Sequence, residues 1–378
     1  MKYYIISGEA SGDLHGSNLI KELRLLDSSA DIRCWGGNLM QKAGGSLVKH
    51  YRELAFMGFA EVIKNLPAIL QNIKFCKQDI LSYQPDVLVL IDYPGFNLRI
   101  AEWAKKQGFK IVYYISPQVW AWKENRVKKM KQCIDKMLCI LPFEKEYYKN
   151  KWNWEVDYVG HPLVQVIEQH QLGVVNRESL IVNSAFNSNS NTRFIALLPG
   201  SRKQEIAKKL PIMLEVAKSF PTYQFVVAQA PGLENAFYAP FMEPYKNVSS
   251  VSNKTYDLLA QSKAALVTSG TATLETALFG VPEIVCYKGS NISYQIARRL
   301  IKIKYISLVN LIMDKLVVKE LIQNDLTTAN LVNELQQLLT NENRIVTLRN
   351  DYAELKTILS KGGHASRQAA KIICDFIK

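Results

Sequence analysis

The chain has 378 residues, more than a single hydrophobic core usually holds, so two domains are expected. Hydrophobic residues make up 48% and charged residues 21%, which excludes a disordered chain, and no run approaches the roughly 18 apolar residues of a membrane-spanning helix. The formal net charge of +13 calls for a negatively charged partner, for which nucleic acid, an anionic membrane and phosphorylated substrates are candidates.

The first half of the chain alternates short apolar runs with helical stretches. The runs expected to form strands are 3–6, 31–35, 86–91, 110–115 and 137–141. Continuous apolar runs are typical of strands buried on both faces, and their alternation with helices predicts a doubly wound parallel sheet. None of the six cysteines forms a C-x-x-C pair, so all are expected as reduced thiols of a cytoplasmic protein.

Residues 56–70 are densely apolar. On a helix, six of these side chains would share one face, namely Phe59, Val62, Ile63, Leu66, Ile69 and Leu70. Such a stripe belongs either to a helix packed on the core or to a helix that rests on a lipid surface. Both interpretations stay open at this point.

The densest basic cluster is RVKKMK, residues 126–131. It predicts either a solvated helix face or a contact with an anionic partner. No zinc-finger, basic-zipper or RNP-like signature accompanies it, which makes nucleic acid the weakest of the three partners.

A polar run without periodicity, residues 187–191, marks a surface excursion near a domain junction. Apolar runs then return at 194–198, 224–228, 264–268 and 283–287 and predict a second parallel sheet. We expect domains at 1–165 and 166–364, with an amphipathic helix at 365–378 that returns to the first domain or to a partner. Two such domains favour binding in a cleft between them, beyond the carboxyl ends of the strands.

The first candidate site follows the first strand, in SGEASGDLHG (7–16). Ser7, Glu9, Ser11 and Gly12 form a loop that a substrate could approach closely, and the following helix favours an anion. The glycine spacing is not G-x-G-x-x-G, which disfavours a nicotinamide dinucleotide. The alternative is a tight strand–helix turn in which Asp13 is a cap.

The second candidate is Asp92, which follows the long apolar run 86–91 and precedes a Pro-Gly turn. A carboxylate held there could take the proton from an attacking hydroxyl group. Capping of the turn is the alternative role.

Two further candidates lie in the second half of the chain. In LLPGSRKQE (197–205), Ser201 and Arg202 follow a strand, and a guanidinium suits a diphosphate because its fork matches paired oxygens. A salt bridge to Glu205 is the alternative for Arg202. In TSGTATLETA (268–277), the backbone N–H groups of Ser269, Gly270 and Thr271 could meet phosphate oxygens, and Glu275 could accept from ribose hydroxyls.

Several ordered segments resemble the lipid-A-disaccharide synthase family, inverting glycosyltransferases of the GT-B fold. The resemblance covers nearly the whole chain. It is carried by SGEASGD (7–13), LAFMGFAEV (54–62), ID-P-FN around Asp92, YYISPQVWAWKENRVKK (113–129), LPFEKEYY (141–148), VGHPL (159–163), LLPGSRKQEI (197–206), TSGTATLE (268–275), YISLVNLIM (305–313) and VKELIQ (318–323). SPQVWAWK together with LPGSR is highly specific.

The resemblance implies transfer of 2,3-diacylglucosamine from UDP to 2,3-diacylglucosamine 1-phosphate, giving a β-1,6-linked disaccharide, with no metal or other cofactor. Asp92 matches the family's essential aspartate, the general base, and Arg202 matches its essential arginine, near the UDP phosphates. Glu275 and Asn310 fall in the UDP-binding region, whereas His161 is interpreted as structural.

The resemblance also implies a peripheral protein on the cytoplasmic face of the inner membrane, without a nucleic-acid partner, and it leaves a homodimer open. Two rival functions remain. One is a UDP-sugar epimerase or another GT-B transferase, and the other is a non-catalytic basic protein that binds membranes or nucleic acid.

Overall fold

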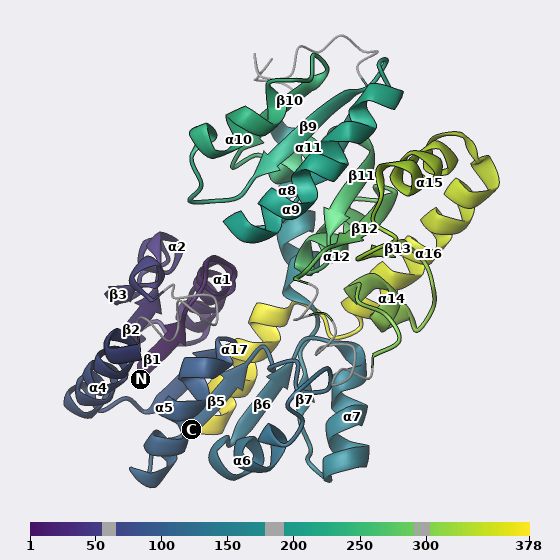
Figure 1. Cartoon of the computed structure of the whole chain (residues 1–378). Helices are drawn as coiled ribbons and strands as arrows, with labels where there is room; N and C mark the ends of the chain where they lie inside the picture. Colours follow the sequence, from purple (N-terminus) through teal and green to yellow (C-terminus); the bar gives the residue numbers. More distant parts are fainter. Residues whose placement is uncertain (55–65, 178–192, 291–293, 295–302) are drawn as a thin grey trace. The chain divides into compact units, whose positions relative to one another are not determined.

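The computed structural model describes residues 1–54, 66–177, 193–290, 294 and 303–378. The chain forms two compact units, Met1–Pro162 with Leu359–Lys378 (unit 1) and Leu163–Ile358 (unit 2). Each unit is a parallel β-sheet with helices packed on it (Figure 1), so the expectation of two doubly wound α/β sheets is confirmed. None of the helices in the described part of the chain is long and apolar enough to cross a membrane.

Unit 1 is built on a seven-stranded sheet in the order β3-β2-β1-β4-β5-β6-β7. Its strands are β1 Lys2–Ser7, β2 Asp31–Gly36, β3 Ser46–His50, β4 Val87–Ile91, β5 Ile111–Tyr114, β6 Lys136–Cys139 and β7 Asp157–Tyr158. Its helices are α1 Ala10–Leu26, α2 Asn38–Lys42, the short 3₁₀ helix η1 Tyr51–Glu53, α4 Leu66–Tyr83, α5 Pro94–Lys106, α6 Arg126–Cys133, α7 Pro142–Trp152 and α17 Ala365–Ile377.

The central strands of unit 1 alternate their side chains between two cores. Tyr4 and Ile6 of β1 belong to one cluster, which also contains side chains of α4, α5 and α6. Tyr3 and Ile5 belong to the other, which contains side chains of α1 and α17. The successive residues of a strand point to opposite faces, so an apolar run such as this one is buried on both sides. The last helix of the chain therefore completes the core of the unit that contains the N-terminus (Figure 1).

Unit 2 has a six-stranded sheet in the order β10-β9-β8-β11-β12-β13. Its strands are β8 Phe194–Leu198, β9 Gln224–Gln229, β10 Val248–Ser252, β11 Ser262–Thr268, β12 Glu283–Tyr287 and β13 Lys319–Ile322. Its helices are α8 Pro162–Arg177, α9 Lys203–Glu215, η2 Val216–Ser219, α10 Asn235–Met242, α11 Thr255–Gln261, α12 Thr271–Leu278, α14 Leu308–Met313, α15 Thr328–Thr340 and α16 Glu342–Ser360.

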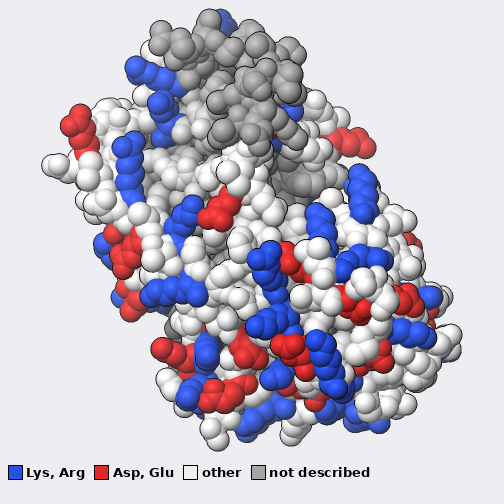
Figure 2. Space-filling view, turned by 180° about the vertical axis from the view of Figure 1, so that it is seen from behind, with Lys and Arg blue, Asp and Glu red and all other residues white. Residues whose placement is uncertain are grey.

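The excess of basic residues is not gathered in one place on the visible surface. On the face in Figure 2, Lys and Arg side chains are interspersed with Asp and Glu. All six cysteines are buried and free. Burial raises the pKa of Cys286 and Cys34 to about 12, which keeps both thiols protonated at neutral pH.

Candidate active site

The loops that follow β1 and β4 lie side by side at the carboxyl edge of the unit 1 sheet. The two strands are paired in parallel, with Ser7 opposite Ile91. The residue after Ile91 is Asp92, so the first and second candidate sites of the sequence meet at one edge. This is where parallel α/β sheets place their ligands.

Asp92 is held in an unusual backbone conformation. Its φ is 43° and that of Tyr93 is 50°, both in the left-handed region that costs a non-glycine residue energy. The carbonyl oxygen of Asp92 accepts hydrogen bonds from the Tyr113 hydroxyl (2.6 Å) and from Asn97 Nδ2 (2.8 Å). Bonds from β5 and α5 thus fix the backbone of the turn at Asp92.

The electrostatics of this edge favour a proton acceptor. The pKa of the Asp92 carboxyl is raised to about 7, chiefly by burial and also by the negative charge of Glu9, against the lowering effect of a hydrogen bond from the backbone of Tyr93. Glu9 is the residue that precedes the first turn of α1. A carboxylate with a pKa near neutrality is suited to general-base catalysis.

The other candidate residues of the first loop differ in how far they are exposed to solvent. Ser7 is buried, with its hydroxyl on the sulfur of Met40 (3.6 Å), and a Cβ on Gly12 would come within 2.8 Å of Ser7 Cβ. Gly12 therefore lets α1 approach β1 closely. Ser11 is exposed in the first turn of α1. Of these three residues, Ser11 has the side chain most open to a substrate.

Asp13 has a structural role in a helix distant in sequence. Its carboxylate accepts hydrogen bonds from the backbone N–H groups of Gly37 (2.8 Å), Leu39 (3.1 Å) and Met40 (3.0 Å). Asp13 therefore caps α2 from its place in the first turn of α1. The capping interpretation was right in kind, and the helix that it caps is α2.

His161 is buried in unit 1, in keeping with a structural role. Its backbone N–H donates to the carbonyl of Leu359 (3.3 Å), and a Cβ on Gly160 would lie 2.5 Å from the carbonyl oxygen of Gly363. Burial, together with the nearby His15, lowers the pKa of His161 to about 3. The VGHPL segment thus packs directly on the chain that leads into α17.

The loop between β5 and α6 is tied to α7. The indole N–H of Trp120 donates to Glu144 (3.2 Å), whose pKa burial raises to about 8. Trp122 is 53% exposed, and the ammonium of Lys123 lies 4.1 Å and the guanidinium of Arg126 5.9 Å from its ring centroid. The basic cluster 126–131 lies in α6, which buries Val127 and Met130 and exposes its lysines.

In unit 2, Arg202 immediately precedes α9. Its backbone is extended, its side chain is 59% exposed, and its Nη1 lies 3.3 Å from Glu205 Oε1. The helix begins at Lys203, and Ser201, two residues before it, is exposed. The salt bridge that was the alternative for Arg202 is present. Because both partners reach solvent, it contributes little to stability and leaves the guanidinium accessible.

The fourth candidate loop joins β11 to α12. Gly270 has φ 145° and, among the residues that the structure describes, nothing lies within 4 Å of a Cβ placed on it, so these residues leave the backbone before α12 open to a ligand. The Ser269 hydroxyl donates to the carbonyl of Ile306 (2.8 Å), and Thr271 begins the helix, exposed. Glu275 accepts from the Tyr256 hydroxyl (2.9 Å), and burial raises its pKa.

Asn310 is fully engaged inside unit 2. Its Nδ2 donates to the carbonyl of Val318 (2.8 Å) and to Glu320 (2.9 Å), and its Oδ1 accepts from the backbone of Val317 and Val318 (2.9 Å each). These bonds use every donor and both acceptor sites of the amide. Asn310 therefore holds the segment before β13 in place, and a ligand cannot bond to its side chain without breaking one of them.

Two polar side chains of this region were not predicted from the sequence. Glu320 accepts from the backbone of Ile306 and Ser307, which links Asn310 to the partner of Ser269. Lys209 of α9 is 97% buried behind the loop that contains Arg202, since only 3% of it is exposed. The sequence does show that Lys209 lies four residues after Glu205, and residues at this spacing share a helix face. That spacing could have predicted the contact between the two side chains.

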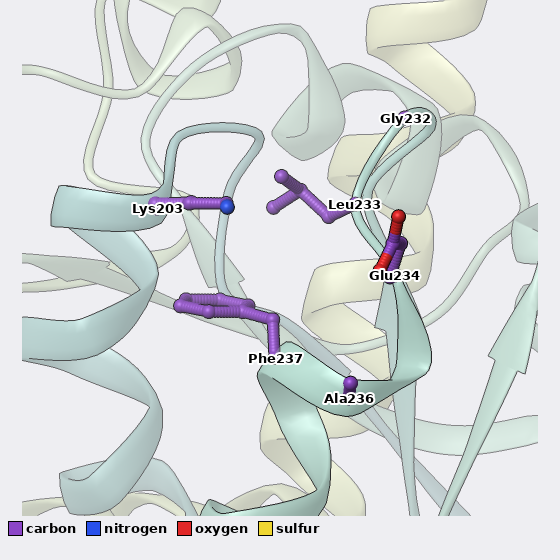
Figure 3. A pocket seen from close by; sticks show the side chains of 6 residues that line it. All are labelled: Lys203, Gly232, Leu233, Glu234, Ala236 and Phe237. Atoms are coloured by element: carbon purple, nitrogen blue, oxygen red, sulfur yellow. The ribbon is translucent and has the colours of Figure 1, made fainter.

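A pocket of about 400 Å³ opens at the start of α9, between the loops that follow β8 and β9. Lys203 reaches over it from the start of α9, with the Phe237 ring 5.7 Å from its ammonium and Leu233 on the facing loop (Figure 3). Its lining residues are Lys203, Gly232, Leu233, Glu234, Ala236 and Phe237. None of these residues was predicted from the sequence to belong to a site.

The apolar stripe of residues 59–70 is only partly visible. Phe59, Val62 and Ile63 lie outside the described residues, and of Leu66 only its place at the start of α4 is described. Ile69 packs against the core of unit 1, whereas Leu70 is 52% exposed. The described end of the stripe thus has one residue on the core and one facing solvent.

Sequence comparisons decide the family. The model of the family described as lipid-A-disaccharide synthetase matches residues 3–375. The chain belongs to the lipid-A-disaccharide synthase family. Among its curated relatives, the lipid-A-disaccharide synthase of Geobacter metallireducens is 37% identical, over 98% of this chain and 96% of the relative. That of Trichlorobacter lovleyi is 35% identical, over 99% and 97%.

Membership of the lipid-A-disaccharide synthase family makes the chain a glycosyltransferase of lipid A biosynthesis. The solved structures similar to it share its fold at low identity. UDP-GlcNAc 2-epimerase from Neisseria meningitidis, bound to UDP-GlcNAc, matches with a TM-score of 0.67 at 15% identity, over 100% of this chain and 99% of that one. The kitacinnamycin glycosyltransferase matches with 0.65 at 12%, over 99% and 98%. These likenesses show the GT-B fold alone.

Proposed function

We propose that this synthase transfers 2,3-diacylglucosamine from UDP to the 6-hydroxyl group of 2,3-diacylglucosamine 1-phosphate. The products are the β-1,6-linked disaccharide 1-phosphate and UDP. The acceptor oxygen forms a bond to the anomeric carbon while the bond from that carbon to the UDP oxygen breaks. Attack from the face opposite UDP inverts the anomeric centre.

Asp92 is the general base that takes the proton from the 6-hydroxyl group. The observation that carries this assignment is its carboxyl, fixed at the carboxyl edge of the unit 1 sheet with a pKa raised to about 7. General-base assistance contributes roughly 10²- to 10⁴-fold to a rate. Unit 1 then takes the acceptor, and Glu9, Ser11 and the backbone at Gly12 line its approach.

Unit 2 binds the UDP-sugar. Arg202 pairs with the diphosphate, supported by its exposed guanidinium next to a helix start. The backbone from Ser269 to Thr271 adds N–H groups at the open start of α12, and Glu275 accepts from the ribose. These groups stabilise the charge that develops on the departing UDP, without a metal. Asn310 supports this site indirectly. It donates to Glu320, which accepts from the backbone of Ile306, the partner of Ser269.

The substrates carry acyl chains, so the enzyme works at the cytoplasmic face of the inner membrane, with unit 1 toward the lipid. Supporting observations are the net charge of +13, the exposed Leu70 and the exposed Trp122 with two cations on its ring. Tryptophan favours the membrane interface, and each nearby basic residue adds about 1 kcal/mol of attraction to an anionic leaflet. Nucleic acid has no role, and a homodimer is compatible with the proposal.

One assay tests the reaction. UDP release from UDP-2,3-diacylglucosamine should require 2,3-diacylglucosamine 1-phosphate, and the product should carry the β-1,6 linkage. Release of UDP without the acceptor, or conversion of the sugar to an epimer, would refute the transfer.

Membrane contact has its own test. Replacement of Val62, Ile63 and Leu66 by serine should shift the protein from vesicles containing anionic phospholipid into the supernatant. Unchanged partitioning would assign the stripe to the core.

A further inference from the structure

The sheet of unit 2 reverses its strand order beside β8. From this first strand the chain moves outward to β9 and β10 on one side, and then returns to β11 on the other. The loops after β8 and β11 therefore flank a topological switch point, the place where open α/β sheets bind ligands. They are also the loops that contain Arg202 and Gly270.

A buried lysine lies behind these two loops. The ammonium of Lys209 donates to the hydroxyl of Thr268, the last residue of β11. It also lies 3.5 Å from the position of a Cβ on Gly200, in the loop after β8. Only 3% of Lys209 is exposed, so its charge lies under the switch point and is not screened by water.

The negative charge that faces this lysine is shared. Glu205 Oε2 lies 3.8 Å from Lys209 Nζ, and Glu205 Oε1 lies 3.3 Å from Arg202 Nη1. One partly exposed carboxylate thus stands between two cations. The three side chains together carry one net positive charge at the end of the sheet where α9 and α12 begin.

Stability does not require a charge at this position. Burial lowers the pKa of Lys209, which reflects the cost of placing an ammonium there. Replacement of a buried ion pair by apolar side chains of similar volume is often neutral or stabilising. A methionine would fill the space, so stability alone does not account for a charge at position 209.

We infer that Lys209 is a positioning residue of a diphosphate site at the switch point of unit 2. Its buried ammonium, behind the loops after β8 and β11, adds a second positive charge to that of Arg202. It acts through the Thr268 hydroxyl and through Glu205, which orients Arg202. The inference rests on the proposed function, since the diphosphate is that of UDP.

The test compares two ligands and two variants. Lys209→Met removes the buried charge, and Lys208→Met removes the same charge from the exposed neighbouring position on α9. UDP affinity is measured by calorimetry, and uridine, which lacks the diphosphate, by ligand-detected NMR. Lys209→Met should weaken UDP binding roughly ten- to hundred-fold and leave uridine unchanged, whereas Lys208→Met should change neither.

Each outcome separates the inference from the proposed function. If UDP does not bind the unaltered enzyme, the proposed function fails. If UDP binds and Lys209→Met binds it equally well, the inference is wrong, and an equal loss for UDP and uridine would also overturn it by assigning Lys209 a purely structural role. Should the methionine variant not fold, Lys209→Gln keeps a donor for Thr268 without the charge and has the same expected result.

Discussion

The ring of Tyr93 lies directly against Gly8. A Cβ placed on Gly8 would come within 2.3 Å of Tyr93 Cδ1, a distance that no side chain could occupy without moving the ring. Gly8 belongs to the loop after β1, and Tyr93 follows Asp92 in the loop after β4. The contact thus couples the loop that contains Glu9 to the turn that holds the proposed base.

Gly8→Ala should therefore reduce both turnover and stability. The added methyl displaces Tyr93, and with it the left-handed turn at Asp92. Overpacking of this kind costs about 1–3 kcal/mol, measured by urea denaturation, while kcat should fall at least ten-fold. Gly95→Ala is the matched control, because no described residue lies within 4 Å of a Cβ at Gly95, which is in the first turn of α5 just after Tyr93. Equal activity of the two variants would contradict this role for Gly8.

Asp92→Asn tests the base itself. Asparagine keeps the shape of the side chain and cannot accept the proton, so kcat should fall roughly 10²- to 10⁴-fold while UDP affinity stays unchanged. Asp86→Asn makes the same substitution at the exposed residue before β4, at the opposite end of the strand. The amide oxygen can still accept from the backbone N–H of Lys2, so this variant should be neutral. A near-native rate for the Asp92 variant would remove Asp92 from the mechanism.

The pH dependence follows from the raised pKa of Asp92. A base must be deprotonated to act, so kcat/KM should rise with pH and level off above about 7. The charge of Glu9 contributes to that raised pKa, and Glu9→Gln should therefore move the rise to lower pH. The position of the limb on the pH axis is the measurement, whatever happens to the absolute rate. An unmoved limb would show that Glu9 does not act on Asp92.

Arg202→Ala should weaken UDP binding roughly ten- to hundred-fold, since it removes a forked donor from a doubly charged ligand. The side chain is 59% exposed, so the melting temperature should stay the same. Arg202→Lys keeps the charge and loses the fork, and we expect it to recover only part of the affinity. Steady-state kinetics with UDP as a product inhibitor supply the measurement, and an unaltered inhibition constant would exclude contact with the diphosphate.

The sequence predicted the inner strands of both sheets and missed every edge strand. All nine expected runs overlap strands in the structure. The four strands that were not predicted, β3, β7, β10 and β13, are the two edges of each sheet. An inner strand is buried on both faces and therefore reads as a continuous apolar run. An edge strand such as Val248–Ser252 is partly exposed along its length, and its three serines resemble a loop.

The candidate loops were predictable for a related reason. The residue after a buried run, such as Asp92, lies at the carboxyl edge of a parallel sheet by topology alone. The partners of each side chain were not predictable. That Asn310 is saturated by the segment before β13, or that Lys209 lies under the loop after β8, depends on packing between elements distant in sequence. Periodicity along the chain contains no information about such contacts.

Glu283, at the start of β12, should make the stability of the protein depend on pH. Its side chain is 1% exposed, and among the described residues neither carboxyl oxygen has a hydrogen-bond partner. Burial raises its pKa well above the ordinary value of 4.5. The folded protein therefore keeps this carboxyl protonated at pH values where the unfolded chain has lost the proton. Because the folded state binds more protons, the free energy of unfolding falls as pH rises above about 4.5, by up to about 1.4 kcal/mol per pH unit.

Glu283→Gln should remove that contribution, because the amide is neutral at every pH. Compared with the unaltered protein, the variant should melt at a higher temperature at pH 8, and the difference should shrink toward pH 5. Glu243→Gln, at the exposed end of α10, serves as the control for loss of a carboxylate and should show no such trend. Calorimetric melting at pH 5, 6.5 and 8 makes the comparison. A difference between Glu283→Gln and the unaltered protein that stayed constant across this range would mean that Glu283 is ionised in the folded state.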